Sequence, residues 1–510
     1  MEMTETNGNA ATVIESPEAD RSRWIALYVL CAGVLMIVLD ATVVNVALPA
    51  IQSDLGFSQS SLAWVVNAYL IAFGGLLLLA GRLGDLISRL DVFLAGLAVF
   101  TAASLVCGFA QSQAMIVAAR FVQGIGGAMT AAVVLGMIVT MFPQPREQAK
   151  AIGVYAFVAS AGGSVGLLAG GVLTQAISWH WIFFINIPIG LFTAIASMRL
   201  LERDRGPGFG HGADVLGAIL ITASLMLGVY TIVEPAAKDG WGDATTLALS
   251  AASLTLLVAF VVRESIARNP LVPLRIFRSR NVAGANLIQA LTVAGMFGMF
   301  FLGVLYLQEV LGYDALETGL AFLPTTLVMG TLSVRYAEPL IMRFGARRTL
   351  LPGLLLIAIG LALFATVPVH GSYVKDVLPP TLLLGLGVGV SFPALMTLAM
   401  SGATREDAGL ASGLVNTTAQ VGAAIGLAVL ATLSASRTDD LLAQGDSTRV
   451  ALTGGYELAF AVAAGLVVAA LVVALAVLEP ERPRGNEAEA GVDPEARRGG
   501  EPEPAYSEAG

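Results

Sequence analysis

An acidic residue and a basic residue stand inside long apolar stretches of this chain. Asp40 lies in the stretch 25–48, and Arg120 lies in the stretch 114–141. A charged side chain at such a position is costly unless it faces a cavity or a partner. A carboxylate stays ionised beside an arginine, whereas one that loses its cation in an apolar setting takes up a proton. The two residues therefore predict a proton carrier, and the alternative is a permanent buried ion pair that only orients helices.

The depths of Asp40 and Arg120 in their stretches agree with each other. Asp40 lies eight residues before the end of its stretch, and Arg120 lies six residues after the start of its own. At about 1.5 Å per helical residue, these depths are about 12 Å and about 9 Å from the same membrane face. We therefore expect the two side chains to pair across a helix bundle.

Polar side chains at helical spacing predict where a substrate binds. Gln123 follows Arg120 by three residues on the same helix face. A second stripe combines the amides of Asn286 and Gln289 with Met296. Amides beside flexible methionines suit a cavity for varied apolar ligands, and the alternative is hydrogen bonding between helices together with core filling. The predicted cavity residues are Asn45, Gln123, Asn286, Gln289, Met296, Asn416 and Gln420.

Other reactive side chains are sparse. Glu309 is a candidate second titrating acid, and the alternative is a solvated residue at a helix end. The three histidines, His180, His211 and His370, lie far apart in the sequence, so we expect no metal site. The sequence shows neither a cluster of acids and histidines nor a nucleophile with its base. We therefore expect no catalytic residues, no enzyme activity and no cofactor.

The elements that must position these residues are membrane helices. Of the 510 residues, 56% are hydrophobic and only 13% are charged, about half the charged share of a soluble domain. This composition excludes a soluble enzyme, and the absence of a basic stripe excludes a nucleic-acid partner. A bilayer-spanning helix needs about 20 apolar residues. Fourteen stretches qualify, at 25–48, 61–81, 92–110, 114–141, 149–174, 181–200, 215–233, 245–262, 282–306, 317–338, 348–367, 377–400, 408–434 and 452–478.

The basic residues predict the orientation of these spans. With the N-terminus inside, 22 of the 28 lysines and arginines fall in cytoplasmic segments and four fall in outer loops. Such a bias predicts that both termini are cytoplasmic. Most of the net charge of −9 lies in the segments 1–23 and 479–510, which we expect to be disordered tails. The segment 263–281 mixes apolar and basic residues, as a linker lying along the cytoplasmic interface does.

Glycines predict how closely the helices pack, and one charged loop predicts a contact that holds the cytoplasmic end in one conformation. Gly162, Gly166 and Gly170 recur every four residues, with Gly171 beside them, and small side chains let helix backbones approach closely. The loop from Gly81 to Asp91 carries Arg82, Asp85 and Arg89, which we expect to clasp the cytoplasmic end in one conformation.

Five stretches make the chain resemble the fourteen-span drug:proton antiporter family of the major facilitator superfamily, over about residues 24–478. They are Leu39–Pro49, Gly81–Arg89, Arg120–Gly127, Trp179–Gly190 and Gly409–Thr417. The resemblance implies an all-α fold with two six-helix bundles, at 24–201 and 281–478. It also implies two accessory helices and a linker at 202–280, alternating access, and proton coupling through Asp40 and Arg120. Arg82, Asp85 and Arg89 match the gating loop of the family.

Two stretches depart from the family pattern. Leu167 follows Gly166 where the antiporter motif of the family has a proline, and the missing kink bears on the direction of transport. Ser88 stands where a glycine is usual and Asp91 where a basic residue is common, which bears on the strength of the clasp.

We expect proton-coupled export of small amphipathic drugs, antibiotics or toxic metabolites across a bacterial plasma membrane. The alternative is a symporter that imports a metabolite on the same fold. The expected partners are the substrate, protons and the lipid bilayer, and we expect a monomer. Three lysines against 25 arginines, with abundant alanine and glycine, point to a GC-rich bacterial genome.

Overall fold

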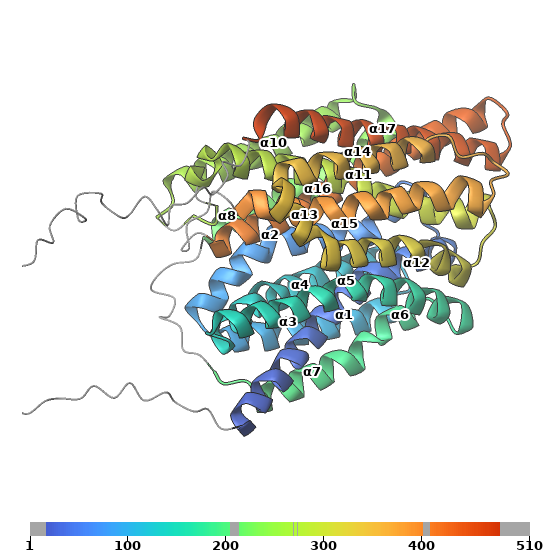
Figure 1. Cartoon of the computed structure of the whole chain (residues 1–510). Helices are drawn as coiled ribbons and strands as arrows, with labels where there is room; N and C mark the ends of the chain where they lie inside the picture. The colour runs from blue at the N-terminus through green and yellow to red at the C-terminus, as the bar shows by residue number, and fades with distance from the viewer. Residues whose placement is uncertain (1–16, 204–213, 269, 273, 401–407, 480–510) are drawn as a thin grey trace, which may run out of the picture.

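The chain folds into a bundle of long helices (Figure 1). The computed structural model describes residues 17–203, 214–268, 270–272, 274–400 and 408–479. Thirteen helices in this described part are long and apolar enough to cross a membrane. The predicted span at 149–174 corresponds to a further long helix, Pro145–Ala176, in which the stretch Val165–Ala176 is apolar. The all-α polytopic fold is therefore confirmed.

The first group of helices packs mainly on itself. It consists of α1 (Pro17–Leu55), η1 (Ser61–Ala63), α2 (Trp64–Leu86), α3 (Arg89–Gly108), α4 (Gln113–Met141), α5 (Pro145–Ala176), α6 (Trp181–Phe184) and α7 (Asn186–Leu200). We call this group the N-terminal bundle. Its helix α1 begins at Pro17, so helix extends into the segment 1–23 for which a disordered tail is predicted.

The remaining helices form a second bundle and a pair beside the two bundles. The accessory pair is α8 (Val215–Val233) and α10 (Ala244–Ile266), with the short α9 (Pro235–Asp239) between them. The C-terminal bundle consists of η3 (Leu274–Arg278), α11 (Arg280–Leu305), η4 (Tyr306–Val310), α12 (Ala315–Thr331), η5 (Leu332–Tyr336), α13 (Ala337–Phe344), α14 (Ala346–Phe364), η6 (Tyr373–Val377), α15 (Leu378–Met400), α16 (Ala408–Ala443) and α17 (Thr448–Val477).

Both ends of the described chain lie at one face of the molecule, on the left of Figure 1. We call it the terminal face, and we call the opposite one the far face. The segment between α2 and α3 lies at the terminal face and is shorter than predicted, because α2 continues through Arg82 and Asp85 to Leu86. Ser88 accepts a hydrogen bond from the backbone N–H of Asp91 and caps α3. This cap is a physical reason for a serine at this position.

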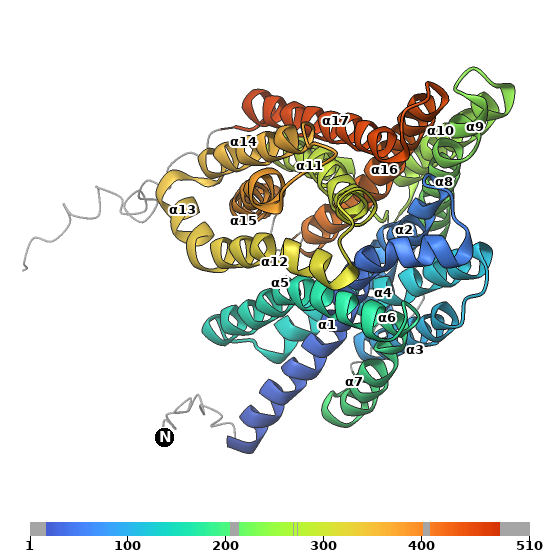
Figure 2. The same ribbon diagram turned by 90° about the vertical axis from the view of Figure 1, so that its right-hand side faces the viewer.

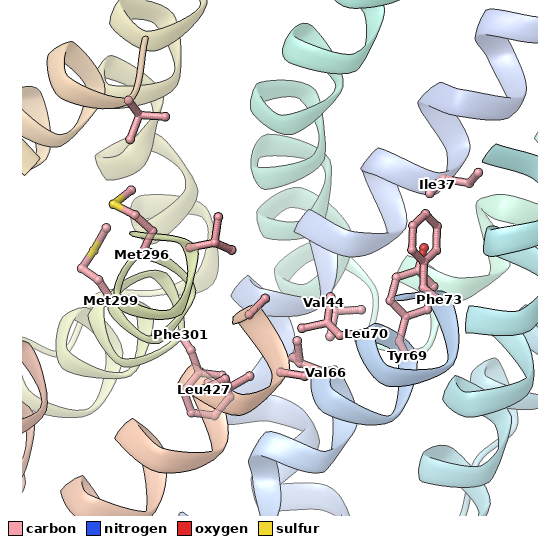
Figure 3. Close-up of a cluster of buried hydrophobic side chains, with 14 of the residues drawn as sticks. Ile37, Val44, Val66, Tyr69, Leu70, Phe73, Met296, Met299, Phe301 and Leu427 are labelled. Carbon is pink, nitrogen blue, oxygen red and sulfur yellow. The ribbon is translucent and has the colours of Figure 1, made fainter. Parts of the chain in front are cut away.

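The two bundles meet along two helix pairs, α5 with α12 and α2 with α16 (Figure 2). Helix α8 packs on α2 and on α16, so the accessory pair lies beside the second of these pairs. One continuous buried cluster joins both bundles. It includes Val66 and Leu70 of α2 together with Phe301 of α11 and Leu427 of α16 (Figure 3).

The linker after α10 packs against protein as well as facing outward. Leu271, Val272 and Ile276 are buried in a small cluster with Leu79 of α2 and Leu414 of α16, whereas Phe277 is exposed. The expected position along the membrane interface stays a prediction for the outer side of this linker. Its inner side touches helices of both bundles at the terminal face.

Candidate functional site

Asp40 and Arg120 form an ion pair inside the N-terminal bundle. Arg120 donates from Nη1 to Oδ2 of Asp40 at 2.5 Å. Asp40 is 0% exposed and Arg120 is 1% exposed. Helices α1 and α4 therefore bring the two residues to one level, as their depths in the sequence predict. A buried pair of this kind needs further hydrogen bonds to offset the loss of hydration.

The other oxygen of the carboxylate is bonded by two amides. Oδ1 of Asp40 accepts from Nε2 of Gln123 at 2.7 Å and from Nδ2 of Asn186 at 2.9 Å. The same two amide groups also donate to the hydroxyl of Ser104, at 2.6 Å and 3.1 Å. Gln123, Asn186 and Ser104 are all 0% exposed. Helices α1, α3, α4 and α7 thus each supply a side chain to one sealed polar cluster.

Arg120 has partners besides Asp40. Its Nε donates to the backbone carbonyl of Val65 at 2.9 Å, and its Nη1 also donates to Oε1 of Gln123 at 2.7 Å. The guanidinium lies over the ring of Tyr69, 4.4 Å from its centroid, and 5.9 Å from the ring centroid of Phe183. These contacts stabilise a cation independently of the carboxylate.

Sequence reasoning did not single out Asn186 or Ser104. Asn186 lies in the Trp179–Gly190 stretch that supports the family resemblance, and it begins α7. The available signal was an amide within an apolar segment, which needs a partner when it is buried. The sequence does not show which face of α7 turns inward, so the partner was not predictable.

The predicted glycines of α5 form two contact faces. A Cβ added at Gly162 or Gly166 would meet side chains of α1, and one at Gly170 would lie 2.9 Å from the backbone of Val43. Gly171 faces the other way, because a Cβ there would lie 2.7 Å from the backbone carbonyl of Ala315 on α12. The stripe therefore lets α5 pack closely on α1, on both sides of Asp40 in the sequence, and on the C-terminal bundle.

The predicted gating residues lie together at the terminal face. Arg89 donates to Oδ1 of Asp85 from Nε at 3.2 Å and from Nη2 at 2.9 Å, and to the hydroxyl of Thr140 on α4 from Nη1 at 2.9 Å. Arg82 is half-buried on the preceding turn of α2. In this conformation the contacts of Asp85 and Arg89 join helices of the N-terminal bundle to one another.

The predicted cavity residues of the C-terminal bundle lie mainly between α11 and α16. Asn286 accepts a hydrogen bond from the hydroxyl of Thr418 at 2.9 Å. Gln289 is buried and its Oε1 has no hydrogen-bond partner. Met296 is buried among apolar side chains (Figure 3). The structure does not gather the seven predicted residues in one place, since Gln123 belongs to the Asp40 cluster.

Three further predicted cavity residues lie near the seam between the bundles. Asn45 is half-buried and donates to the carbonyl of Ala41 on its own helix. Gln420 packs on Gly74 of α2, because a Cβ added at Gly74 would lie 2.7 Å from the Cβ of Gln420. Asn416, one turn earlier on α16, is exposed.

Glu309 lines a small cavity at the far face. The cavity has a volume of about 80 Å³, and both bundles contribute to its wall. The lining residues are Gln52, Gln59, Leu305, Glu309, Leu452 and Tyr456. The carboxyl group of Glu309 is exposed, as expected for an acid at a helix end.

Comparisons with known proteins identify the superfamily of the chain. Residues 30–427 match the family model described as Major Facilitator Superfamily. The chain is 38% identical to the puromycin resistance protein pur8 of Streptomyces alboniger over 474 residues, covering 92% of this chain and 94% of that one. It is also 38% identical to the cephamycin export protein CmcT of Amycolatopsis lactamdurans, covering 90% and 92%.

Solved structures show the same fold. A bacterial homologue of the human lysosomal transporter Spinster superposes with a TM-score of 0.66 at 15% identity, covering 90% of this chain and 99% of that one. A bacterial homologue of the human peptide transporters PepT1 and PepT2 gives 0.61 at 14% identity, covering 89% and 98%. The chain is therefore a multi-pass membrane transporter, and it belongs to the Major Facilitator Superfamily.

Proposed function

We propose that the protein exports small amphipathic compounds, antibiotics among them, in exchange for protons. Relatives that match nearly the whole chain are named for resistance to puromycin and for export of cephamycin. The observation that supports proton coupling is the sealed cluster around Asp40, because its donors stabilise the ionised carboxylate and because Arg120 has other partners when Asp40 is neutral. The proposed location is a bacterial plasma membrane, with the terminal face in the cytoplasm and the protein acting as a monomer.

Protonation of Asp40 is the coupling step. A proton arriving at Oδ2 removes the negative charge that faces Arg120, and the ion pair opens. The guanidinium then retains the carbonyl of Val65, the amide oxygen of Gln123 and the ring of Tyr69. These contacts lower the cost of breaking the pair, which is about 3–5 kcal/mol where a buried charge is left without a partner.

Helix α5 transmits the change to the other bundle. Thr42 lies two residues after Asp40, and a Cβ added at Gly166 of α5 would overlap its hydroxyl. On its opposite face, α5 touches α12 through Gly171 and Ala315. A shift of α1 that follows opening of the ion pair therefore moves a helix at the seam, and rocking of the two bundles alternates access to the substrate.

The proton gradient supplies enough free energy for this exchange. One proton moving down about 100 mV yields about 2.3 kcal/mol, and one pH unit adds about 1.4 kcal/mol. Together they sustain a substrate gradient of several hundred-fold per proton.

The decisive variant is Asp40→Asn, which keeps the shape of the side chain and removes its titration. In everted vesicles with an imposed pH gradient, the wild type should accumulate puromycin or another compound from a panel of antibiotics. Asp40→Asn should abolish the uphill accumulation while membrane insertion, measured by the amount of folded protein, stays normal. Asp239→Asn, an exposed acid on α9, serves as the control and should leave accumulation unchanged.

Two outcomes contradict the proposal. Uphill accumulation by Asp40→Asn would remove Asp40 from the coupling step. Accumulation that requires the opposite sign of the gradient would identify a symporter that imports its substrate.

A further inference from the structure

A second group of buried charged side chains lies at the base of the accessory pair, and the proposed export cycle does not use it. Asp214 caps the N-terminus of α8 and is 4% exposed, and Glu264 near the end of α10 is 3% exposed. Arg263 donates from Nε to both oxygens of Asp214 at 3.1 Å. Arg263 therefore neutralises Asp214. No ion pair among the described residues joins Glu264 to a cation.

The carboxyl group of Glu264 faces the backbone of the linker, where its hydrogen-bonding neighbours are the N–H groups of Val272 and Leu271. Its Oε2 accepts from the backbone N–H of Val272 in the linker at 2.8 Å. Its Oε1 is buried and has no hydrogen-bond partner. An ionised carboxylate in this situation costs several kcal/mol, because a buried charge needs a paired cation or several donors. A protonated carboxyl group avoids most of that cost.

The unpartnered oxygen of Glu264 and the carboxylate of Asp214 face the same small volume. A Cβ added at Gly217 would lie 2.8 Å from Oε1 of Glu264 and 3.1 Å from Oδ2 of Asp214. Gly217 leaves this volume open, and its own N–H donates to Oδ1 of Asp214 at 2.9 Å. Two carboxyl groups that share such a site do not both ionise easily, and one of them keeps a proton.

We propose that Glu264 and Asp214 form a second proton-binding site, separate from Asp40, in which Glu264 holds the proton on Oε1 and directs it toward Asp214. The described charged groups that face Glu264 are Asp214 on α8 and Arg263 on its own helix. The third neighbouring element, the linker, contributes the backbone N–H of Val272.

The consequence of this site is control of the linker. While Glu264 is protonated, it holds Val272 in the cluster with Leu79 of α2 and Leu414 of α16. When the proton leaves Oε1, the ionised carboxylate accepts the hydrogen bond from Val272 more strongly. The linker is then held more tightly where both bundles meet at the terminal face, so the pH at that face acts on the contact between them.

Infrared spectroscopy of the full chain in lipid nanodiscs tests the protonation state directly. The wild type should show the carbonyl stretch of a protonated carboxyl group near neutral pH, and Glu264→Gln should lose that band. Glu338→Gln, an exposed acid on α13, should retain it. A wild-type spectrum that matches that of Glu264→Gln in this region overturns the proposal and indicates an ionised Glu264.

Hydrogen exchange measured on the linker peptide tests the consequence. In the wild type, protection relative to the intrinsic exchange rate should increase as pH rises, whereas in Glu264→Gln it should stay constant. Asp214→Asn should move this increase to lower pH, because a nearby negative charge no longer holds the proton on Glu264. Identical pH dependence in the wild type and in Glu264→Gln contradicts the proposal. Neither measurement uses transport, so the result is independent of the proposed export function.

Discussion

At the scale of single residues, the Asp40 cluster explains how an ion pair is stabilised inside a membrane protein. It also provides the carboxyl group that is protonated in the proposed cycle. Each oxygen of the carboxylate is bonded, one by Arg120 and the other by the amides of Gln123 and Asn186. Donors to an ionised carboxylate favour the ionised form, since that form accepts their hydrogen bonds best. In the proposed coupling step, the loss of a donor therefore makes protonation of the cluster easier.

Asn186→Leu removes one donor at nearly constant volume. The variant loses one charge-assisted hydrogen bond, which removes about 1.5 kcal/mol of stabilisation from the ionised form of Asp40. The protonated form should therefore be more populated at a given pH. We expect the pH profile of proton-driven transport to move upward by about one unit. Transport measured in vesicles across a pH series checks this shift.

Asn67→Leu is the matched control for Asn186→Leu. Asn67 is also buried in the N-terminal bundle, and neither of its polar side-chain atoms has a hydrogen-bond partner. Its loss should leave the pH profile in place. A profile that moves equally in both variants would mean that Asn186 acts only through packing.

At the scale of helices, α5 connects the buried cluster with the second bundle. Its glycines bring the backbone of α5 against α1 on one face and against α12 on the other. Leu167 stands where the family has a proline, and the helix still runs without interruption from Pro145 to Ala176. The carbonyl of Leu167 also approaches Gly319 of α12, since a Cβ added there would lie 2.7 Å from it.

Gly170→Ala should separate α5 from α1. The added Cβ would lie 2.9 Å from the backbone of Val43, which cannot move aside as a side chain does. We expect a stability loss of about 1–3 kcal/mol, the usual cost of overpacking, together with reduced transport. A thermal unfolding assay in detergent and vesicle transport check the two effects.

Gly163→Ala provides the comparison within the same helix. A Cβ at Gly163 would meet nothing within 4 Å, so this change should be neutral or slightly stabilising, as an alanine in a helix normally is. Equal destabilisation by the two variants would show that helix propensity, and not the contact with α1, explains the glycine stripe.

Particular residues show which parts of the structure could be predicted from the sequence. Asp40 and Arg120 were predictable because a charge inside an apolar stretch has a definite depth, and depth decides which residues can meet. The glycine stripe was predictable because four-residue spacing keeps residues on one face of a helix. Ser104, Asn186 and the pairing of Glu264 with Asp214 were not predictable, because they depend on how each helix is rotated about its axis. Only contacts among several helices determine that rotation.

At the scale of the whole molecule, polar contacts at the far face hold the bundles together in this conformation. Gln175 at the end of α5 donates to Oδ2 of Asp314 at 2.8 Å and accepts from the backbone N–H of Leu316 at 3.3 Å. Gln308 of η4 donates to the carbonyl of Val46 on α1 at 3.0 Å. The two bundles are thus joined across the seam at the face opposite the termini.

This far-face contact should not depend on pH in the physiological range. The backbone N–H of Glu317 and the side chain of Gln175 hold the pKa of Asp314 below its ordinary value of 3.8. A lowered pKa means that the stabilisation is present above the ordinary value and is lost only as pH falls through the lowered one. The contact therefore persists at neutral pH, so the proposed proton-coupling step does not act through Asp314.

Gln175→Ala should shift the molecule toward a form that is open at the far face. Loss of the two hydrogen bonds corresponds to about 1 kcal/mol, or about a five-fold change in the ratio of the two forms. Distances between spin labels at the exposed positions Ile177 and Leu320 report this ratio. Gln111→Ala, an exposed glutamine between α3 and α4, should leave the distribution unchanged, and a similar change there would argue against a specific role for Gln175.

The complete burial of the Asp40 cluster has a consequence for inhibition and for the evolution of resistance. No surface of this carboxylate is open to a drug-sized molecule in the conformation described. An inhibitor of the proposed coupling step therefore has to act on the contact between the bundles instead of binding to the carboxylate. Under the proposed function, residues that contact the substrate can vary under antibiotic selection while the cluster stays unchanged. Variants with altered drug spectra should therefore map outside its five side chains, which are those of Asp40, Ser104, Arg120, Gln123 and Asn186.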